Sequence, residues 1–161
     1  MREKIKERDE LEEILEGLKR RGKKIVFTNG CFDILHIGHT RCLEEAKKLG
    51  DALVVALNSD RSARSIKGPS RPCTPQAERA EVLSALACVD YVVIFDEPDP
   101  LELITCLKPN ILVKGGDWTA ETTIGRDVVE DAGGRVVIIP QIQGVSTSDI
   151  IDRIRKKGGK A

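Results

Sequence analysis

The chain has 161 residues, the size of one domain, since single domains cluster near ~100–200 residues. Lysine plus arginine and aspartate plus glutamate each number 26, and this zero net charge argues against nucleic acid or an anionic membrane as a partner. Aromatic residues make up only 3%, which excludes stacking platforms for single strands. A charged start, MREKIKERDE, and five cysteines without CxxC spacing predict a cytoplasmic protein with reduced thiols.

Residues 1–23 are predicted to form a charged helix that packs on the edge of the domain. Asp9 followed by Glu12 has the spacing of a capping box for its start, and Gly22 is expected to end it. The main domain is expected to span residues 24–157, with a tail at 158–161. The helix is recognised by apolar residues at the spacing of one helical face: Leu11, Ile14, Leu15 and Leu18.

Helical patterns, including segments over about 37–49 and 75–87, separate the apolar runs of the main domain. Thr74-Pro75 and Asp99-Pro100 each place a capping side chain before a first-turn proline. Wholly apolar, β-branched runs that alternate with helices indicate a buried parallel sheet. The sequence therefore predicts a single α/β domain, Rossmann-like, with a doubly wound, parallel, five-stranded sheet. The predicted strands lie at 24–28, 52–57, 91–95, 111–113 and 136–139.

In doubly wound sheets, ligands bind beyond the carboxyl ends of the strands, near the switch point of the strand order. Neither the dinucleotide fingerprint GxGxxG nor the phosphate loop GxxxxGK[ST] occurs in this chain. A nucleotide bound here would therefore be held by a different binding motif.

The first predicted strand leads into Thr28-Asn-Gly-Cys-Phe-Asp-Ile-Leu-His36-Ile-Gly-His39, which contains both histidines of the chain. Their spacing places both imidazoles on one side of the first turn of the next helix. Free backbone N–H groups and the positive helix end would join them in binding phosphate oxygens, and would favour neutral rings. Gly38 would let a phosphate approach closely. A structural role, or half of a zinc site with Cys31 or Asp33, is the alternative.

This segment, Thr28–Asp33 followed by His36-Ile-Gly-His39, resembles the HxGH signature of the nucleotidyltransferase superfamily. Within it, the chain is most similar to the D-glycero-β-D-manno-heptose 1-phosphate adenylyltransferase family, the ADP-heptose synthase domain. The resemblance covers about residues 24–155. It rests on LEEAKKLGD, NSD at 58–60, KGPSRP at 67–72, ERAEVLSALACVDYVVIFDE at 78–97, LVKGGDW at 112–118 and STSDII at 146–151.

The resemblance implies an adenylyltransferase that uses ATP and a sugar phosphate, with Mg²⁺ carried by the ATP phosphates and no side-chain metal ligand. No covalent enzyme intermediate is expected, and no activated nucleophile motif such as GxSxG appears. A cytidylyltransferase acting on glycerol 3-phosphate and a non-catalytic nucleotide sensor are the alternatives. Relatives that dimerise suggest a homodimer. Because 161 residues leave no room for the kinase domain fused to some relatives, we expect a separate sugar kinase, unless this is one domain of such a fusion.

By motif, the catalytic residues are expected to be His36, His39, Lys67 and Arg79, with His39 nearest the α-phosphate and Arg79 on the leaving phosphates. Substrate binding is expected from Asp33, Lys67 and Trp118, although Asp33 also suits a structural turn and Trp118 a packed surface. Val145, Ser148 and Cys42 depart from the family pattern. The expected nucleotide-binding residues are Thr28, Asn29, Gly30, Cys31, Phe32, Gly38, Lys114, Gly115, Asp117, Ser146, Thr147 and Ser148.

Overall fold

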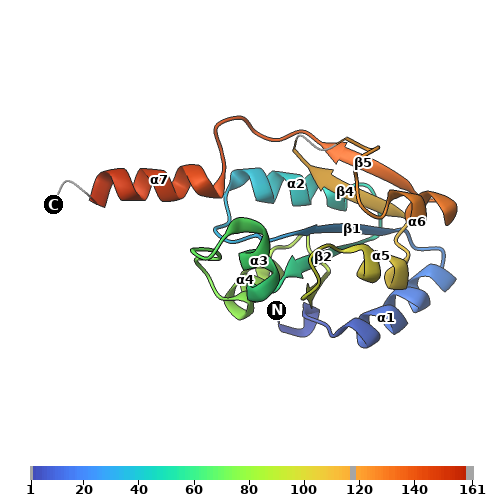
Figure 1. Ribbon diagram of the computed structural model, residues 1–161. Coiled ribbons are helices and arrows are strands. Elements are labelled where there is room, and N and C mark those ends of the chain that lie inside the picture. Colours follow the sequence, from blue (N-terminus) through green and yellow to red (C-terminus); the bar gives the residue numbers. More distant parts are fainter. Residues whose placement is uncertain (1, 117–118, 159–161) are drawn as a thin grey trace.

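A computed structural model describes residues 2–116 and 119–158 of the chain (Figure 1). The described residues form one five-stranded parallel sheet with the strand order β3-β2-β1-β4-β5. This confirms the predicted fold class, and each apolar run of the sequence becomes one strand. The strands are β1 (Ile25–Gly30), β2 (Ala52–Asn58), β3 (Tyr91–Phe95), β4 (Ile111–Gly115) and β5 (Arg135–Ile139).

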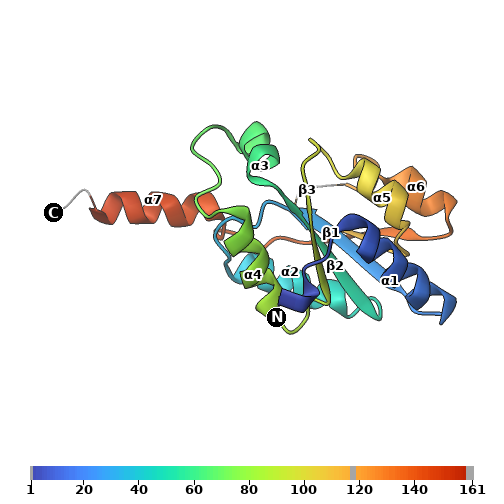
Figure 2. The same cartoon turned by 90° about the horizontal axis from the view of Figure 1, so that it is seen from below.

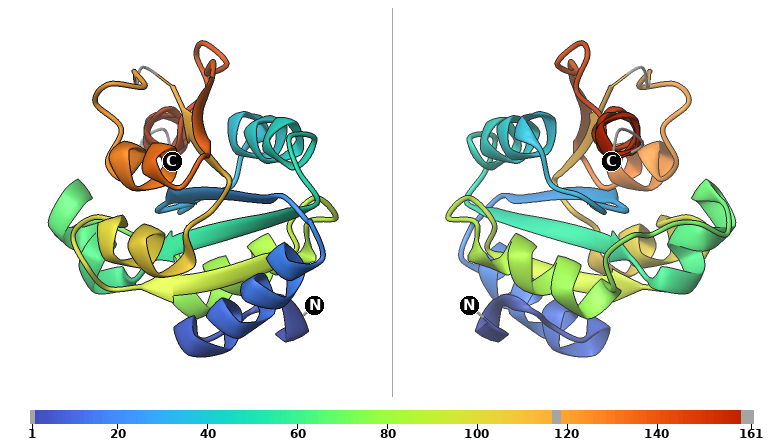
Figure 3. Two further views of the ribbon diagram at one scale, coloured as in Figure 1. Left: turned by 90° about the vertical axis from the view of Figure 1, so that its right-hand side faces the viewer. Right: turned by 90° about the vertical axis from the view of Figure 1, so that its left-hand side faces the viewer.

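Helices cover both faces of the sheet, as Figure 3 shows. The short helices η1, α3 and α6 were not anticipated from the sequence. None of the described helices is long and apolar enough to cross a membrane. The helices are η1 (Arg2–Lys4), α1 (Arg8–Arg20), α2 (Ile37–Lys47), α3 (Asp60–Lys67), α4 (Gln76–Ala85), α5 (Leu101–Leu107), α6 (Arg126–Asp131) and α7 (Thr147–Gly158).

Alternation along β1 divides the core between the two faces, because successive strand residues point to opposite sides. Ile25 and Phe27 pack with α1, α5 and α6, and Val26 packs with α2 and α4. All three side chains are fully buried. At ~1.5–3 kcal/mol for each fully buried large aliphatic or aromatic side chain, this two-sided burial is the main source of stability.

The amino-terminal helix α1 packs against β1, β3 and α5 through Leu11 and Leu15, which are buried. It begins one residue before Asp9, and Glu7 at its cap position makes no side-chain capping bond. The predicted capping box is therefore wrong, because Asp9 already lies within the first turn. Gly22 follows the helix with φ of +73°, a conformation that glycine adopts without strain.

The two helix starts that the sequence predicts at prolines differ from one another in the structure. Before α5 the cap position is occupied by Pro100, but Asp99 Oδ1, one residue earlier, accepts the N–H of Leu101, the first residue of the helix, at 2.9 Å. At α4 the cap position is occupied by Pro75, and no side chain caps the helix. Thr74 instead donates its backbone N–H to Asp33 at 2.9 Å, which ties this turn to the loop after β1.

The carboxyl-terminal helix α7 extends away from the sheet (Figures 1 and 2), and none of its described residues is buried. Its beginning is tied to the loop before α2, because Thr147 Oγ1 donates to the carbonyl of Ile34 at 3.2 Å. Ser146 Oγ accepts the N–H of Asp149 at 3.1 Å, which confirms the predicted helix start at the Ser146–Ser148 segment.

Candidate active site

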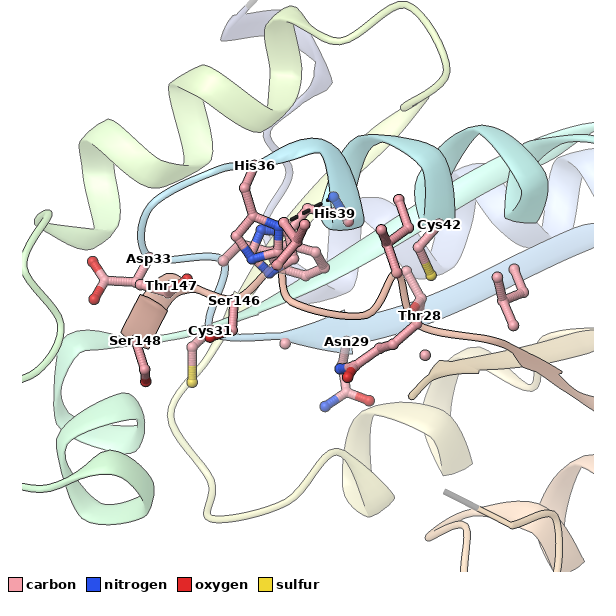
Figure 4. A pocket seen from close by; sticks show the side chains of 18 of the residues that line it. Thr28, Asn29, Cys31, Asp33, His36, His39, Cys42, Ser146, Thr147 and Ser148 are labelled. Carbon is pink, nitrogen blue, oxygen red and sulfur yellow. Dashed lines mark hydrogen bonds between the residues drawn. The ribbon is translucent and has the colours of Figure 1, made fainter. Parts of the chain in front are cut away.

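A cavity of about 300 Å³ lies at the switch point of the sheet, between the neighbouring strands β1 and β4. Strands β2 and β3 continue the sheet on the β1 side, and β5 continues it on the β4 side. The walls of the cavity come from the end of β1, the loop before α2, the end of β4 and the segment 139–148 (Figure 4). This is where ligands bind in doubly wound sheets. The predicted location of the site therefore coincides with a cavity.

The loop after β1 is shaped by a close contact between Gly30 and Phe32. A Cβ atom at Gly30 would lie 3.0 Å from the Phe32 ring, so any larger residue would require that folded-back ring to shift. Phe32 itself has φ of +41°, which is unusual for a bulky residue and is typical of functional loops. Its ring packs 5.2 Å from the His39 ring, centroid to centroid. The strained turn thus supports one of the two histidines.

His36 and His39 form a stacked pair with ring centroids 3.8 Å apart (Figure 4). His36 caps α2, and its Nδ1 accepts the N–H of Gly38 at 3.1 Å, so a neutral ring carries its proton on Nε2. Burial lowers the pKa of His36, and burial followed by the charge of His36 lowers the pKa of His39 to about 4. Both rings are therefore neutral near pH 7.

Gly38 lines the cavity, where the sequence predicts the close approach of a phosphate, and it also makes room for a neighbouring side chain. A Cβ atom at this position would lie 2.9 Å from two atoms of the His36 ring. The glycine therefore makes room for the imidazole and for its hydrogen bond to the backbone. Nδ1 of His39 is buried without a hydrogen-bond partner among the described residues, which is uncommon for a buried polar atom and is compatible with a functional role.

Asp33 lines the cavity, but its carboxylate is already engaged by the protein. It accepts the backbone N–H groups of Cys73 and Thr74 at 2.8 and 2.9 Å, and Nε of Arg71 at 2.6 Å. Although burial alone would raise it, these hydrogen bonds hold the pKa of Asp33 below its usual range. Asp33 thus anchors the 68–75 loop, which is the structural alternative considered for it, while its substrate-binding role stays a prediction.

Two cations line the cavity. Lys67, the last residue of α3, is exposed and lies where the sequence predicted a flexible ammonium group. Arg71, four residues further along, was not predicted. The sequence signal for Arg71 is its place in the KGPSRP segment, in a loop that follows the carboxyl end of β2 and α3.

Arg79 does not line the cavity, contrary to the prediction that it meets the leaving phosphates. Its side chain is fully buried and donates to the carbonyls of Cys31, Asn58 and Thr74. Its remaining partner is the Asp60 carboxylate, at 2.7 Å. These bonds engage every nitrogen of the guanidinium, so the arginine joins the β1 loop, the end of β2 and the start of α4.

Gly115 lines the cavity at the end of β4, and the buried Lys114 beside it contacts Asn29 Oδ1. Burial lowers the pKa of Lys114 to about 8, with partial compensation from Asp99. Lys114 is not part of the described cavity lining but contacts Asn29, which is. Asp117 and Trp118, also predicted in this segment, lie outside the described residues.

The two thiols beside the site, Cys31 and Cys42, have raised pKa values. Burial raises the pKa of Cys31 against the opposing effect of Lys67, and burial raises that of Cys42.

The described residues contain no group of three or more histidine, cysteine or acidic side chains that could hold a metal ion. The zinc alternative for the histidine pair therefore lacks its remaining ligands. The absence of such a group among the described residues is compatible with Mg²⁺ that is held by substrate phosphates, as Mg²⁺ often is.

The cavity brings together most of the predicted residues, which are Thr28, Asn29, Gly30, Cys31, Phe32, Asp33, His36, Gly38, His39, Lys67, Gly115, Ser146, Thr147 and Ser148. Residues that sequence reasoning did not place there are Cys42, Arg71, Ile139, Pro140, Gln141, Ile142 and Val145. The apolar members of this second set end β5 and begin the loop after it, positions that sequence alone does not distinguish from core.

A doubly wound sheet with neutral imidazoles at a helix start beside its switch point is the arrangement of an HxGH nucleotidyltransferase. Comparison with known proteins agrees: a sequence profile described as cytidylyltransferase-like matches residues 27–153. The chain therefore belongs to the cytidylyltransferase-like family, and the predicted superfamily is confirmed.

Among curated proteins, the bifunctional protein HldE of Syntrophotalea carbinolica is 58% identical over 94% of this chain and 31% of its own length. The bifunctional protein HldE of Geobacter metallireducens is 57% identical over 98% of this chain and 32% of its own length. The chain thus spans about a third of these relatives. Among solved structures, a lipopolysaccharide core biosynthesis protein from Thermoplasma volcanium is 33% identical, with a TM-score of 0.62 over 75% of this chain and 98% of that one.

Proposed function

We propose that this chain transfers AMP from ATP to D-glycero-β-D-manno-heptose 1-phosphate, giving ADP-heptose and pyrophosphate. The observation that carries the proposal is the stacked pair of His36 and His39 at the start of α2, facing the switch-point cavity. The heptose substrate is supported by the sequence resemblance, by relatives at 57–58% identity named HldE, and by a structural relative from lipopolysaccharide core biosynthesis.

In the proposed reaction, an oxygen of the sugar phosphate attacks the α-phosphorus of ATP while the bond from that phosphorus to the β-phosphate oxygen breaks. The attacking oxygen is already ionised, so the reaction needs no general base. This suits a site whose histidines are neutral and act as N–H donors. Catalysis then consists of positioning and of stabilising charge on the phosphates.

The residues have distinct proposed roles. His36 Nε2–H and the first N–H groups of α2 bind the triphosphate, and His39 lies nearest the α-phosphate. Lys67 adds a mobile positive charge at the cavity mouth. The start of α7 at Ser146–Ser148 supplies a second set of N–H groups and hydroxyls for phosphate or ribose oxygens. Mg²⁺ bound by the ATP phosphates supplies further charge neutralisation.

The remaining proposals concern the context of the reaction. We propose that the reaction takes place in the cytoplasm, that the chain forms a homodimer, and that a sugar kinase supplies the heptose 1-phosphate. The bifunctional names of the relatives and the third of their length that this chain spans also fit a kinase located on the same polypeptide.

The test is Mg²⁺-dependent release of pyrophosphate in a substrate panel. The four nucleoside triphosphates are each combined with heptose 1-phosphate, other sugar 1-phosphates and glycerol 3-phosphate. Release with ATP and heptose 1-phosphate is expected. Release confined to CTP and glycerol 3-phosphate would reassign the substrates, and ATP binding without turnover in any combination would indicate a nucleotide sensor.

A further inference from the structure

The loop at residues 68–75 reaches the cavity and is fixed there by one buried carboxylate. The Asp33 side chain is 1% exposed, and both of its oxygens accept hydrogen bonds from this loop. Two of the donors are backbone N–H groups, at Cys73 and Thr74, so the loop remains tied to Asp33 whatever side chain occupies position 71.

Arg71 meets Asp33 through only one of its three nitrogens. The hydrogen bond runs from Nε to Oδ2 at 2.6 Å, and the side chain remains 16% exposed in the cavity wall. Within the described part of the chain, its two terminal nitrogens make no hydrogen bond. A bond at Nε fixes the plane of a guanidinium, so those terminal nitrogens are held in a defined direction while four N–H donors stay available.

We propose that Arg71 binds phosphate oxygens of a substrate in this cavity and that Asp33 is the residue that positions it. Two parallel N–H groups of a guanidinium match two oxygens of one phosphate, which an ammonium group such as Lys67 cannot do. The leaving-phosphate role that the sequence assigned to Arg79 passes to Arg71, since Arg79 has no free nitrogen. This inference rests on the proposed function only in requiring a phosphorylated ligand.

A purely architectural role for the ion pair makes different predictions. In that case, removal of Arg71 would lower thermal stability without changing ligand affinity. Arg71→Met separates the two roles, because it deletes the guanidinium but leaves the two backbone bonds from Cys73 and Thr74 to Asp33 intact. Arg61→Met is the matched control: Arg61 also pairs with an aspartate, Asp96, but its side chain is 77% exposed and does not line the cavity.

The experiment measures binding of Mg·ATP and of heptose 1-phosphate separately by calorimetry, with a thermal melt of each variant. Arg71→Met is expected to weaken binding of at least one ligand roughly 10- to 100-fold, the value of a charge-assisted hydrogen-bonding pair, whereas Arg61→Met leaves both unchanged. A loss confined to ATP assigns the nucleotide phosphates, and a loss confined to the sugar assigns the acceptor phosphate. Unchanged affinities for both ligands in a folded Arg71→Met protein overturn the proposal.

The positioning role is tested by a double-mutant cycle and by chemical rescue. Asp33→Asn should weaken the same ligand, and the double variant with Arg71→Met should bind no worse than Arg71→Met alone. Added guanidinium should partly restore binding to Arg71→Ala but not to Arg71→Ala with Asp33→Asn. Additive effects, or equal rescue of both proteins, contradict positioning by Asp33. If Asp33→Asn melts below the assay temperature, Asp33→Glu keeps the charge, displaces the carboxylate and takes its place in the cycle.

ATP binding does not depend on the identity of the acceptor. If the acceptor is not heptose 1-phosphate, the wild-type protein will show no turnover with that sugar. An effect of Arg71→Met on ATP affinity would still be measured. The two failures can thus be told apart.

Discussion

Substitution of Arg79 by methionine distinguishes a structural role of this arginine from a role in phosphate binding. The change keeps the aliphatic volume but removes the donors to the carbonyls of Cys31, Asn58 and Thr74. The fourth partner, Asp60, is 35% exposed and can regain water. Breaking a buried pair costs ~3–5 kcal/mol, and this exposure favours the lower end, about 3 kcal/mol. For a chain of this length, that lowers Tm by roughly 6–12 °C.

The assay is thermal and urea unfolding followed by circular dichroism, combined with ATP binding at a temperature where the variant is folded. Arg61→Met again serves as control, because an exposed ion pair contributes less than about 1 kcal/mol. ATP affinity close to wild type together with the lowered Tm supports the buried, architectural role. A normal Tm with lost ATP affinity would show that Arg79 contacts the ligand and would refute this reasoning.

The remaining predictions concern the histidines. His39→Ala should lower kcat by about 10²–10³-fold with little change in Tm, and an unaltered kcat would remove this ring from the mechanism. In an NMR titration, His39 Hε1 should report a pKa of about 4. The free energy of unfolding should fall as the pH drops from about 6.5 to 4, because in this range the His39 ring takes up a proton only in the unfolded chain. A normal pKa near 6.5 would contradict the burial of this ring. Gly38→Ala should displace the His36 ring, break its hydrogen bond to the backbone and lower kcat/KM about tenfold. Gly17→Ala in α1 is the control: its new Cβ would approach only Arg20, at 3.9 Å, so kcat/KM should not change.

The sheet could be predicted because its strands are buried on both faces and therefore appear as uninterrupted apolar runs. The short helix α3 could not: DRSARSIK contains few apolar residues, and its start depends on Ser59 Oγ accepting the N–H of Ser62. Helix α6 has only six residues, too few for a clear periodicity. The strand order, which creates the switch point, depends on contacts distant in the sequence.

The site could be located but not fully assigned. The histidine pair and the loop before it are contiguous in sequence, so local spacing was enough to place them together. Arg71 and Arg79 both follow β2 in polar, turn-rich sequence, and nothing local indicates that one is buried and the other faces the cavity. That distinction arises from partners distant in the chain: Asp33, 38 residues before Arg71, holds Arg71 in the cavity wall, and the carbonyl of Cys31, 48 residues before Arg79, helps to hold Arg79 in the interior.

Adenylyl transfer itself is tested most directly with ATP labelled at its α-phosphorus. With Mg²⁺ and heptose 1-phosphate, the account predicts that the label moves into a sugar nucleotide and that an equal amount of unlabelled pyrophosphate is released. Label that stays in ATP, or that appears as free AMP without a sugar nucleotide, would contradict the account.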